Sequence, residues 1–261
     1  MPDFVNKGIR LEYEITGEGK PLVFLHGMGG SIRQIEAVYE RIEGVQLIAL
    51  NQQGHGRSGA DWDSLDFDRM GDDVAALLDH LGIEQAYFAG ISMGAAVSLN
   101  VALRYPGRVR KMLLIRNAWT DSPMSCEVQK AYHDLGMALK EGGIEAFCQT
   151  RGWEIAAKAS AYTRNAFLSS FQDTASVKNW QKFLILPGKA PAASAKSLRE
   201  LGIPVVILAN KNDLCHPYAY GEYLHEMIPH SLLTEIPDKD TDSTAHRQMI
   251  NQAVRNMLAS L

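Results

Sequence analysis

The sequence has few cysteines, and none of them forms a familiar motif. The three, Cys126, Cys148 and Cys215, are widely spaced and include no Cys-x-x-Cys pair. An odd and scattered set favours reduced thiols that pack as small apolar side chains over a disulfide framework. We therefore expect a cytoplasmic protein without structural disulfides.

Long apolar runs are also missing, as is an excess of either charge. No stretch approaches the roughly 20 apolar residues that a membrane-spanning helix needs, and the segment 1–8 lacks the basic-then-apolar layout of a signal peptide. Lys and Arg number 26 against 30 for Asp and Glu, which gives a net charge of −4. This balance gives no reason to expect a nucleic acid or a membrane as partner. A small-molecule substrate is the expected partner.

The chain has an ordinary globular composition and a regular alternation of strand and helix patterns. Apolar residues make up 46% of its 261 residues, enough for a sizeable core. Short apolar runs with little polar alternation, typical of strands buried on both faces, alternate with segments of helical periodicity. The predicted strands are 9–16, 21–25, 45–50, 86–89, 109–115, 204–209 and 232–236, and the predicted helices between them include 31–42, 67–81 and 93–104. The pattern predicts an α/β fold with a mostly parallel twisted sheet and helices on both faces.

This alternation of predicted strands and helices stops near Asn117. Residues 120–195 contain helical stretches but no convincing strand, and the strand pattern resumes only at 204–209. Such a connection is too long for an ordinary loop. We therefore predict a core formed by residues 1–119 and 196–261, interrupted by a helical cap at 120–195.

The strongest chemical signal is the segment Gly90-Ile91-Ser92-Met93-Gly94, between a predicted strand and a predicted helix. A strand-to-helix turn this tight forces its central residue into a strained conformation, and the flanking glycines remove side chains that would clash. The turn exposes the serine hydroxyl at the carboxyl edge of the sheet, where ligands bind in open α/β folds. Ser92 is therefore the predicted nucleophile.

A serine hydroxyl needs a base to take its proton and an acid to orient that base. Asp213 follows the predicted strand 204–209, and His246 follows the strand 232–236, so the chain order is Ser, Asp, His. We predict Asp213 as the acid and His246 as the base. Asp121, after an earlier strand, is the alternative acid. His216 lies near Asp213 in sequence, but that proximity does not place it near Ser92, so it is not the predicted base.

The developing oxyanion also needs donors. His26-Gly27-Met28-Gly29-Gly30 follows the buried strand 21–25, and its glycines allow a backbone N–H to point into the site. We predict the N–H groups of Met28 and Met93 as the two donors.

Together these segments resemble the α/β-hydrolase superfamily, in the branch with a helical cap. The resemblance covers nearly the whole chain and includes Gly54-His55-Gly56-Arg57-Ser58, which is similar to a family loop that shapes the site. Ser92 at the elbow, where other branches carry Asp, excludes epoxide hydrolases and haloalkane dehalogenases. The chain departs from many relatives at Asn51-Gln52-Gln53, where an acidic and a basic residue are common, and at Ala245, where glycine is common.

The sequence therefore predicts a serine hydrolase that needs no metal or cofactor and cleaves a small ester or lactone through an acyl-enzyme. One alternative is a ligand-binding or signalling protein with low turnover on the same fold. Another is an acyltransferase or a carbon–carbon bond hydrolase with the same triad. Trp119, Trp153 and Phe167 are the candidates for an apolar substrate pocket under the cap.

Overall fold

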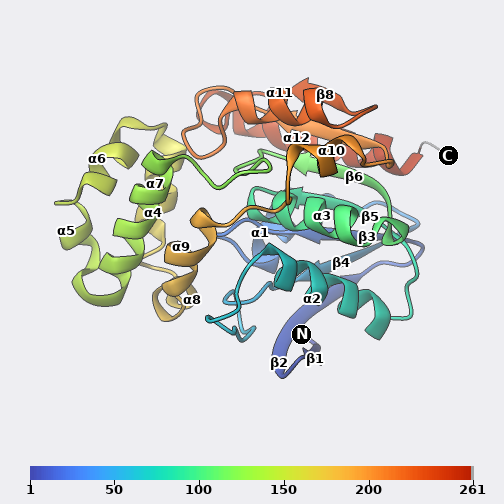
Figure 1. The fold of residues 1–261 in the computed structure, drawn as a ribbon, viewed down its shortest axis with the longest axis horizontal. Helices are drawn as coiled ribbons and strands as arrows, with labels where there is room; N and C mark the ends of the chain where they lie inside the picture. Colours follow the sequence, from blue (N-terminus) through green and yellow to red (C-terminus); the bar gives the residue numbers. More distant parts are fainter. Residues whose placement is uncertain (260–261) are drawn as a thin grey trace.

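The computed structural model describes residues 1–259, which fold around one eight-stranded sheet in the order β1-β2-β4-β3-β5-β6-β7-β8 (Figure 1). β1 pairs antiparallel with β2 and β2 with β4, and all later pairs are parallel. The strands are β1 (Asp3–Asn6), β2 (Ile9–Thr16), β3 (Lys20–Leu25), β4 (Val45–Leu50), β5 (Ala86–Ile91), β6 (Val109–Ile115), β7 (Val205–Ala209) and β8 (Leu232–Glu235). The predicted fold class is confirmed.

The strand order places the site. β3 lies between β4 and β5, so the chain goes from β3 to one side and then crosses to the other. The loops that follow β3 and β5 therefore diverge at the carboxyl edge of the sheet, at a topological switch point. Leu22 to Leu25 of β3 form an apolar run that is fully buried, because helices cover both faces of the sheet.

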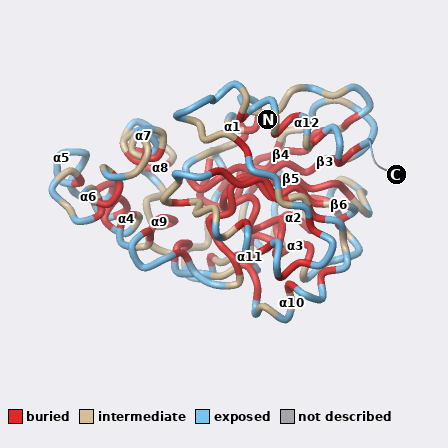
Figure 2. The backbone as a smooth tube through the Cα atoms, turned by 90° about the horizontal axis from the view of Figure 1, so that it is seen from above, coloured by how far each residue is buried: buried red, intermediate tan, exposed pale blue. Residues whose placement is uncertain are grey.

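Helices pack on the two faces of this sheet, and the buried sheet lies between them (Figure 2). Apolar side chains of α2, α3 and α11 join the larger core cluster, whereas those of α1 and α12 join the smaller one. These helices are α1 (Ile32–Val38), α2 (Phe67–His80), α3 (Met93–Arg104), α11 (Tyr218–Met227) and α12 (Lys239–Ala259), and a 3₁₀ turn, η1 (Pro106–Arg108), precedes β6. No helix in residues 1–259 has the length and apolar character to cross a membrane.

The segment between β6 and β7 carries only helices among its regular elements, and most of them lie beyond the edge of the sheet (Figure 1). Several of its buried side chains, including Phe147 and Phe167, belong to the same apolar cluster as the core. The elements are α4 (Cys126–Met137), η2 (Ala138–Gly142), α5 (Gly143–Phe147), α6 (Arg151–Lys158), α7 (Ala161–Ser169), α8 (Thr174–Lys178), α9 (Gln181–Ile185), η3 (Leu186–Gly188) and α10 (Ala195–Arg199). The predicted helical insertion is thus present, while the domain boundaries at 120 and 195 stay a prediction.

Candidate active site

Ser92 occupies a strained turn between β5 and α3. Its φ of 56° and ψ of −111° lie in a region that residues with a side chain rarely adopt. A Cβ on Gly90 would lie 2.2 Å from the Gly94 carbonyl oxygen, and one on Gly94 would lie 2.2 Å from that of Leu25. Only glycine fits at both positions, so the G-x-S-x-G spacing is a steric requirement of this turn.

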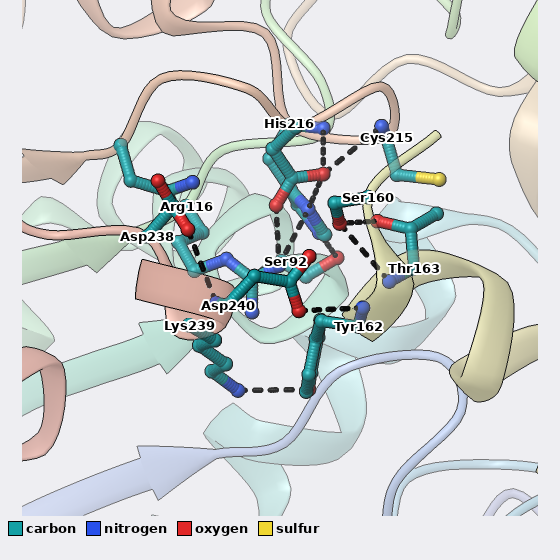
Figure 3. A network of polar contacts seen from close by, with 12 residues as sticks. Ser92, Arg116, Ser160, Tyr162, Thr163, Cys215, His216, Asp238, Lys239 and Asp240 are labelled. Atoms are coloured by element: carbon teal, nitrogen blue, oxygen red, sulfur yellow. Dashed lines mark hydrogen bonds and ion pairs between the residues drawn. The ribbon is translucent and has the colours of Figure 1, made fainter. Parts of the chain in front are cut away.

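The side chain that meets Ser92 is His216. His216 Nε2 lies 2.9 Å from Ser92 Oγ (Figure 3), and its Nδ1 lies 2.9 Å from Asp213 Oδ1. The same Oδ1 accepts the backbone N–H groups of Cys215 and His216, at 3.1 and 3.2 Å. Because a carboxylate only accepts, the Nδ1 proton points to Asp213 and leaves the Nε2 lone pair for the serine proton. The three side chains form a continuous hydroxyl–imidazole–carboxylate chain.

This arrangement corrects the sequence prediction for the base. His246 lies inside α12, where its Nδ1–H donates to the Pro237 carbonyl oxygen at 2.7 Å and its buried Nε2 has no partner among residues 1–259. The structure therefore does not bring His246 against Ser92, and the expectation that His216 lies away from it was wrong. Asp121, the alternative acid, accepts the Tyr223 hydroxyl at 3.0 Å instead.

His216 was missed because the base was sought only after the last strand. The loop after β7 turns back on itself, since two backbone N–H groups converge on the Asp213 carboxylate. Pro217 then begins α11 by acting as its N-cap. The segment Asp213-x-x-His216-Pro217 is the sequence signal, because a turn of this kind places residues i and i+3 side by side.

The electrostatics of the pair suit proton transfer. Burial alone would raise the pKa of Asp213, but His216 and Arg116 beside its carboxylate hold that pKa well below its usual range. Burial lowers the pKa of His216, and the nearby Arg116 cation lowers it further, while Asp213 opposes both. The acid is thus ionised and the base neutral near neutral pH, the states that a serine nucleophile needs.

The loop after β3 lies directly against the elbow. A Cβ on Gly27 would be 3.4 Å from that of Ser92, and Met28 lines the same cavity. Met93 follows Ser92 directly as the first residue of α3. Both predicted donors therefore belong to segments that adjoin the nucleophile, and their role as an oxyanion hole stays a prediction.

Buried side chains hold this loop in place. The Gly27 N–H donates to Gln34 Oε1 at 2.8 Å, and His55 Nε2 lies 2.7 Å from the Met28 carbonyl oxygen. His26 accepts the Gln52 N–H at Nε2, so its Nδ1 carries the proton that it donates to the Gly27 carbonyl. Burial lowers the pKa of His26 to about 4, which keeps it neutral. The Gln52 side chain also donates to the His26 carbonyl oxygen at 2.9 Å, so the unusual Asn51-Gln52-Gln53 segment helps to hold the loop.

A cavity of about 370 Å³ opens onto Ser92 and His216 between the core and the insertion. Its remaining walls come from the loop after β3, the elbow, the segment after β6 and the helices α1, α4, α7 and α9 with the residue after α7, through Gly27, Met28, Gly29, Gln34, Ile91, Arg116, Tyr132, Leu135, Tyr162, Asn165, Ala166, Phe167, Ser169, Ser170 and Phe183. A larger groove of about 800 Å³ shares Gly29 and Gln34 with it but contains neither Ser92 nor His216. The cavity beside Ser92 is the candidate substrate site.

Only one of the three predicted pocket aromatics lines this cavity. Phe167 does, stacked on Tyr132 with ring centroids 4.9 Å apart. Trp119 packs edge-on against Phe67 of α2, and Trp153 packs against Phe147 within the insertion. The prediction for both tryptophans is corrected, because their rings fill apolar gaps between helices and do not reach the cavity.

Phe167 and Trp153 therefore offer a matched test of the cavity. We expect Phe167→Ala to change the ratio of kcat/KM between short and long acyl esters by about tenfold, because apolar pocket contacts discriminate at that scale. Trp153→Ala should lower Tm and leave the ratio unchanged. Steady-state kinetics on an acyl-length series and thermal unfolding measure both effects. Equal ratios in the two variants would contradict a substrate role for Phe167.

Within residues 1–259, no group of three or more His, Cys, Asp or Glu side chains is arranged to hold a metal ion.

Comparison with known proteins gives the same picture. Residues 20–133 match the family model described as alpha/beta hydrolase fold. A 108-residue stretch, 41% of the chain, is 44% identical to the dihydrolipoyllysine-residue acetyltransferase component of the acetoin cleaving system of Pseudomonas putida, of which it spans 29%. Across 96% of its length the chain is 25% identical to 3-oxoadipate enol-lactonase 2 of Acinetobacter baylyi, covering 93% of it. The fold matches MGS-M2, an alpha/beta hydrolase from a deep-sea metagenome library, with a TM-score of 0.81, 18% identity, and coverage of 100% of this chain and 98% of that one.

Proposed function

Because the chain belongs to the α/β-hydrolase superfamily, we propose that it is a serine hydrolase that cleaves a small ester or lactone through an acyl-enzyme. The observation that carries the proposal is the chain from Ser92 through His216 to Asp213, set at a strained elbow and open to the cavity. The likeness to an enol-lactonase over nearly the whole length supports an ester or lactone bond as the target.

The first half of the reaction forms the acyl-enzyme. As Ser92 Oγ attacks the substrate carbonyl carbon, His216 Nε2 takes its proton, and Asp213 stabilises the imidazolium that forms. The Met28 and Met93 N–H groups bind the negative oxygen of the tetrahedral intermediate, where one such donor contributes about 10²- to 10³-fold in rate. The intermediate collapses when the leaving alcohol oxygen takes the proton from His216. In a lactone this oxygen stays attached to the acyl chain.

The second half releases the acid. His216 removes a proton from water, the resulting hydroxide attacks the acyl carbonyl, and Ser92 leaves with the proton from His216. The volume of about 370 Å³ lies near the lower end of the roughly 300–1,000 Å³ range of small-molecule sites. Short acyl groups should therefore be better substrates than long ones.

Covalent labelling and turnover together test this proposal. A fluorophosphonate should label Ser92, and a panel of short p-nitrophenyl esters, lactones and amides should show turnover of esters or lactones. Labelling without turnover of any member would favour a binding or signalling protein, and activity only with an added acyl acceptor would favour an acyltransferase. Absence of labelling in the folded protein would contradict the proposed nucleophile.

A further inference from the structure

A buried arginine lies against the acid of the proposed triad. Arg116 follows β6 directly, with a φ of 53°, and its N–H donates to the Leu208 carbonyl oxygen at 2.8 Å. Its side chain and that of Asp213 are each only 4% exposed, and Nη2 of Arg116 donates to Oδ2 of Asp213. Removing a cation from water is costly, and only well-placed contacts with a carboxylate offset that cost. We therefore asked what these contacts do for Asp213.

The two oxygens of the Asp213 carboxylate have different partners. Oδ1 receives His216 Nδ1 and two backbone N–H groups, while Oδ2 receives Arg116. The guanidinium is itself held over the Tyr162 ring, 5.0 Å from its centroid. Since both oxygens are engaged, the carboxylate plane is fixed, and Oδ1 keeps facing the base.

Arg116 also approaches the base itself. Its Nη2 lies 3.2 Å from His216 Nδ1. A guanidinium has no lone pair to offer, and the Nδ1 proton already points to Asp213, so this contact sets a cation beside an N–H. A second positive charge on His216 would be repelled there, and Asp213 compensates only in part because Arg116 shares it.

We propose that Arg116 is a positioning residue for the Ser92–His216–Asp213 triad, which fixes Asp213 through Oδ2 and opposes protonation of His216. The inference rests on the proposed function, because it assigns His216 as the base. Its consequence is an enzyme that keeps its base neutral, and therefore active, at a lower pH than an isolated Asp–His pair would allow.

Other charged and titratable groups also surround His216. Burial and Arg116 lower its pKa, Lys239 at the start of α12 lowers it as well, and Asp213 raises it. From the insertion, Tyr162 adds a hydroxyl that accepts Lys239 Nζ at 2.8 Å, and Tyr132 of α4 also lines the cavity. The buried Cys215 beside it is neutral, because burial raises its pKa to about 12. Arg116 and Lys239 are thus the cations whose removal should move the titration.

The pH dependence of kcat/KM tests the proposal, since it reports the protonation of the free enzyme's base. Only neutral His216 accepts the serine proton, so activity falls as pH drops through its pKa. In Arg116→Met the lost positive charge should raise that pKa and move the midpoint of the acid limb upward by about one unit. Plateau kcat should fall by about 10- to 100-fold, because a misplaced base costs rate at this scale.

Arg116→Lys separates charge from geometry. Lysine keeps the positive charge but lacks the planar fork, so the midpoint should stay near that of the wild type while plateau kcat remains reduced. Lys239→Met, which removes the second cation, should shift the midpoint in the same direction with plateau kcat nearly unchanged. Should Arg116→Met fail to fold, Arg116→Lys decides alone, and a wild-type plateau in that variant would overturn the proposal.

A failure of the role of Arg116 can be distinguished from a failure of the proposed function. A folded Arg116→Met protein with an unmoved midpoint and an inactive His216→Ala protein would overturn the role of Arg116 and leave the proposed function intact. If His216→Ala keeps its activity, the base of the proposed function fails first, and the role of Arg116 fails with it. A uniform loss that follows Tm, without a pH shift, would show Arg116 to be purely structural.

Discussion

Ser92→Ala should lower kcat by roughly 10⁴- to 10⁶-fold, because loss of the nucleophile removes the acyl-enzyme route altogether. The fold should be retained, since alanine leaves the flanking glycines and the turn unchanged. Turnover of a short p-nitrophenyl ester measures the loss, and the variant should no longer be labelled by a fluorophosphonate. Circular dichroism and Tm establish that the protein is folded.

Ser98 provides the matched control. It is also buried and lies in α3, with its hydroxyl donating to the Gly94 carbonyl oxygen at 2.8 Å. Ser98→Ala should keep most of the activity and all of the labelling, at a cost of about 1 kcal/mol in the free energy of unfolding for the lost hydrogen bond. Retention of more than a tenth of the wild-type kcat in a folded Ser92→Ala protein would contradict the assignment of the nucleophile.

Periodicity alone was enough to predict the sheet and its principal helices. The buried parallel strands carry unbroken apolar runs, and the elbow motif lies at one of their ends, so strand positions and nucleophile were predicted together. The failures are local. The strand β1 was not predicted, because it has only four residues and pairs with β2 alone at the edge of the sheet. The helix predicted over 31–42 ends earlier, at Val38, where Tyr39 adopts an extended conformation.

The start of the last helix determines the surroundings of His246. Asp238 accepts the Thr241 N–H at 2.8 Å, and Asp242 accepts that of Ala245 at 2.8 Å. Both are N-cap contacts. The second lies at Asp242, where α12 kinks. The helix therefore contains His246 and does not follow it. An aspartate at an N-cap position is the sequence signal that a helix begins ahead of His246.

Long-range contacts set the rest of the site, and a single sequence does not show them. Arg116 follows β6, Tyr162 lies in the insertion and Lys239 in α12, and the three meet only in the folded chain (Figure 3). No spacing rule joins residues so far apart. The sequence identified Ser92 from the turn in which it lies, whereas the structure was needed for residues that meet only when distant segments come together.

His216→Ala should be nearly as damaging as loss of the nucleophile, lowering kcat by roughly 10⁴- to 10⁶-fold, because the serine proton then has no acceptor. His246→Ala should leave kcat within a fewfold of the wild type. Removing its hydrogen bond to Pro237 should lower the free energy of unfolding by about 1–3 kcal/mol. His216→Ala should lose mainly activity, whereas His246→Ala should lose mainly stability, so kcat and Tm must be measured on both.

The two histidines also differ in their hydrogen-bond partners. Burial lowers the pKa of His246 to about 4, and in the part of the chain that the structure describes no carboxylate is hydrogen bonded to either of its nitrogens. A base without an anionic partner would have to form its imidazolium uncompensated in a buried site, whereas His216 forms it against Asp213. An inactive His246→Ala protein beside an active His216→Ala protein would reverse this assignment and restore the order predicted from the sequence. Loss of both activities with Tm unchanged would mean that His246 acts on the reaction through a route other than the hydrogen bonds described here.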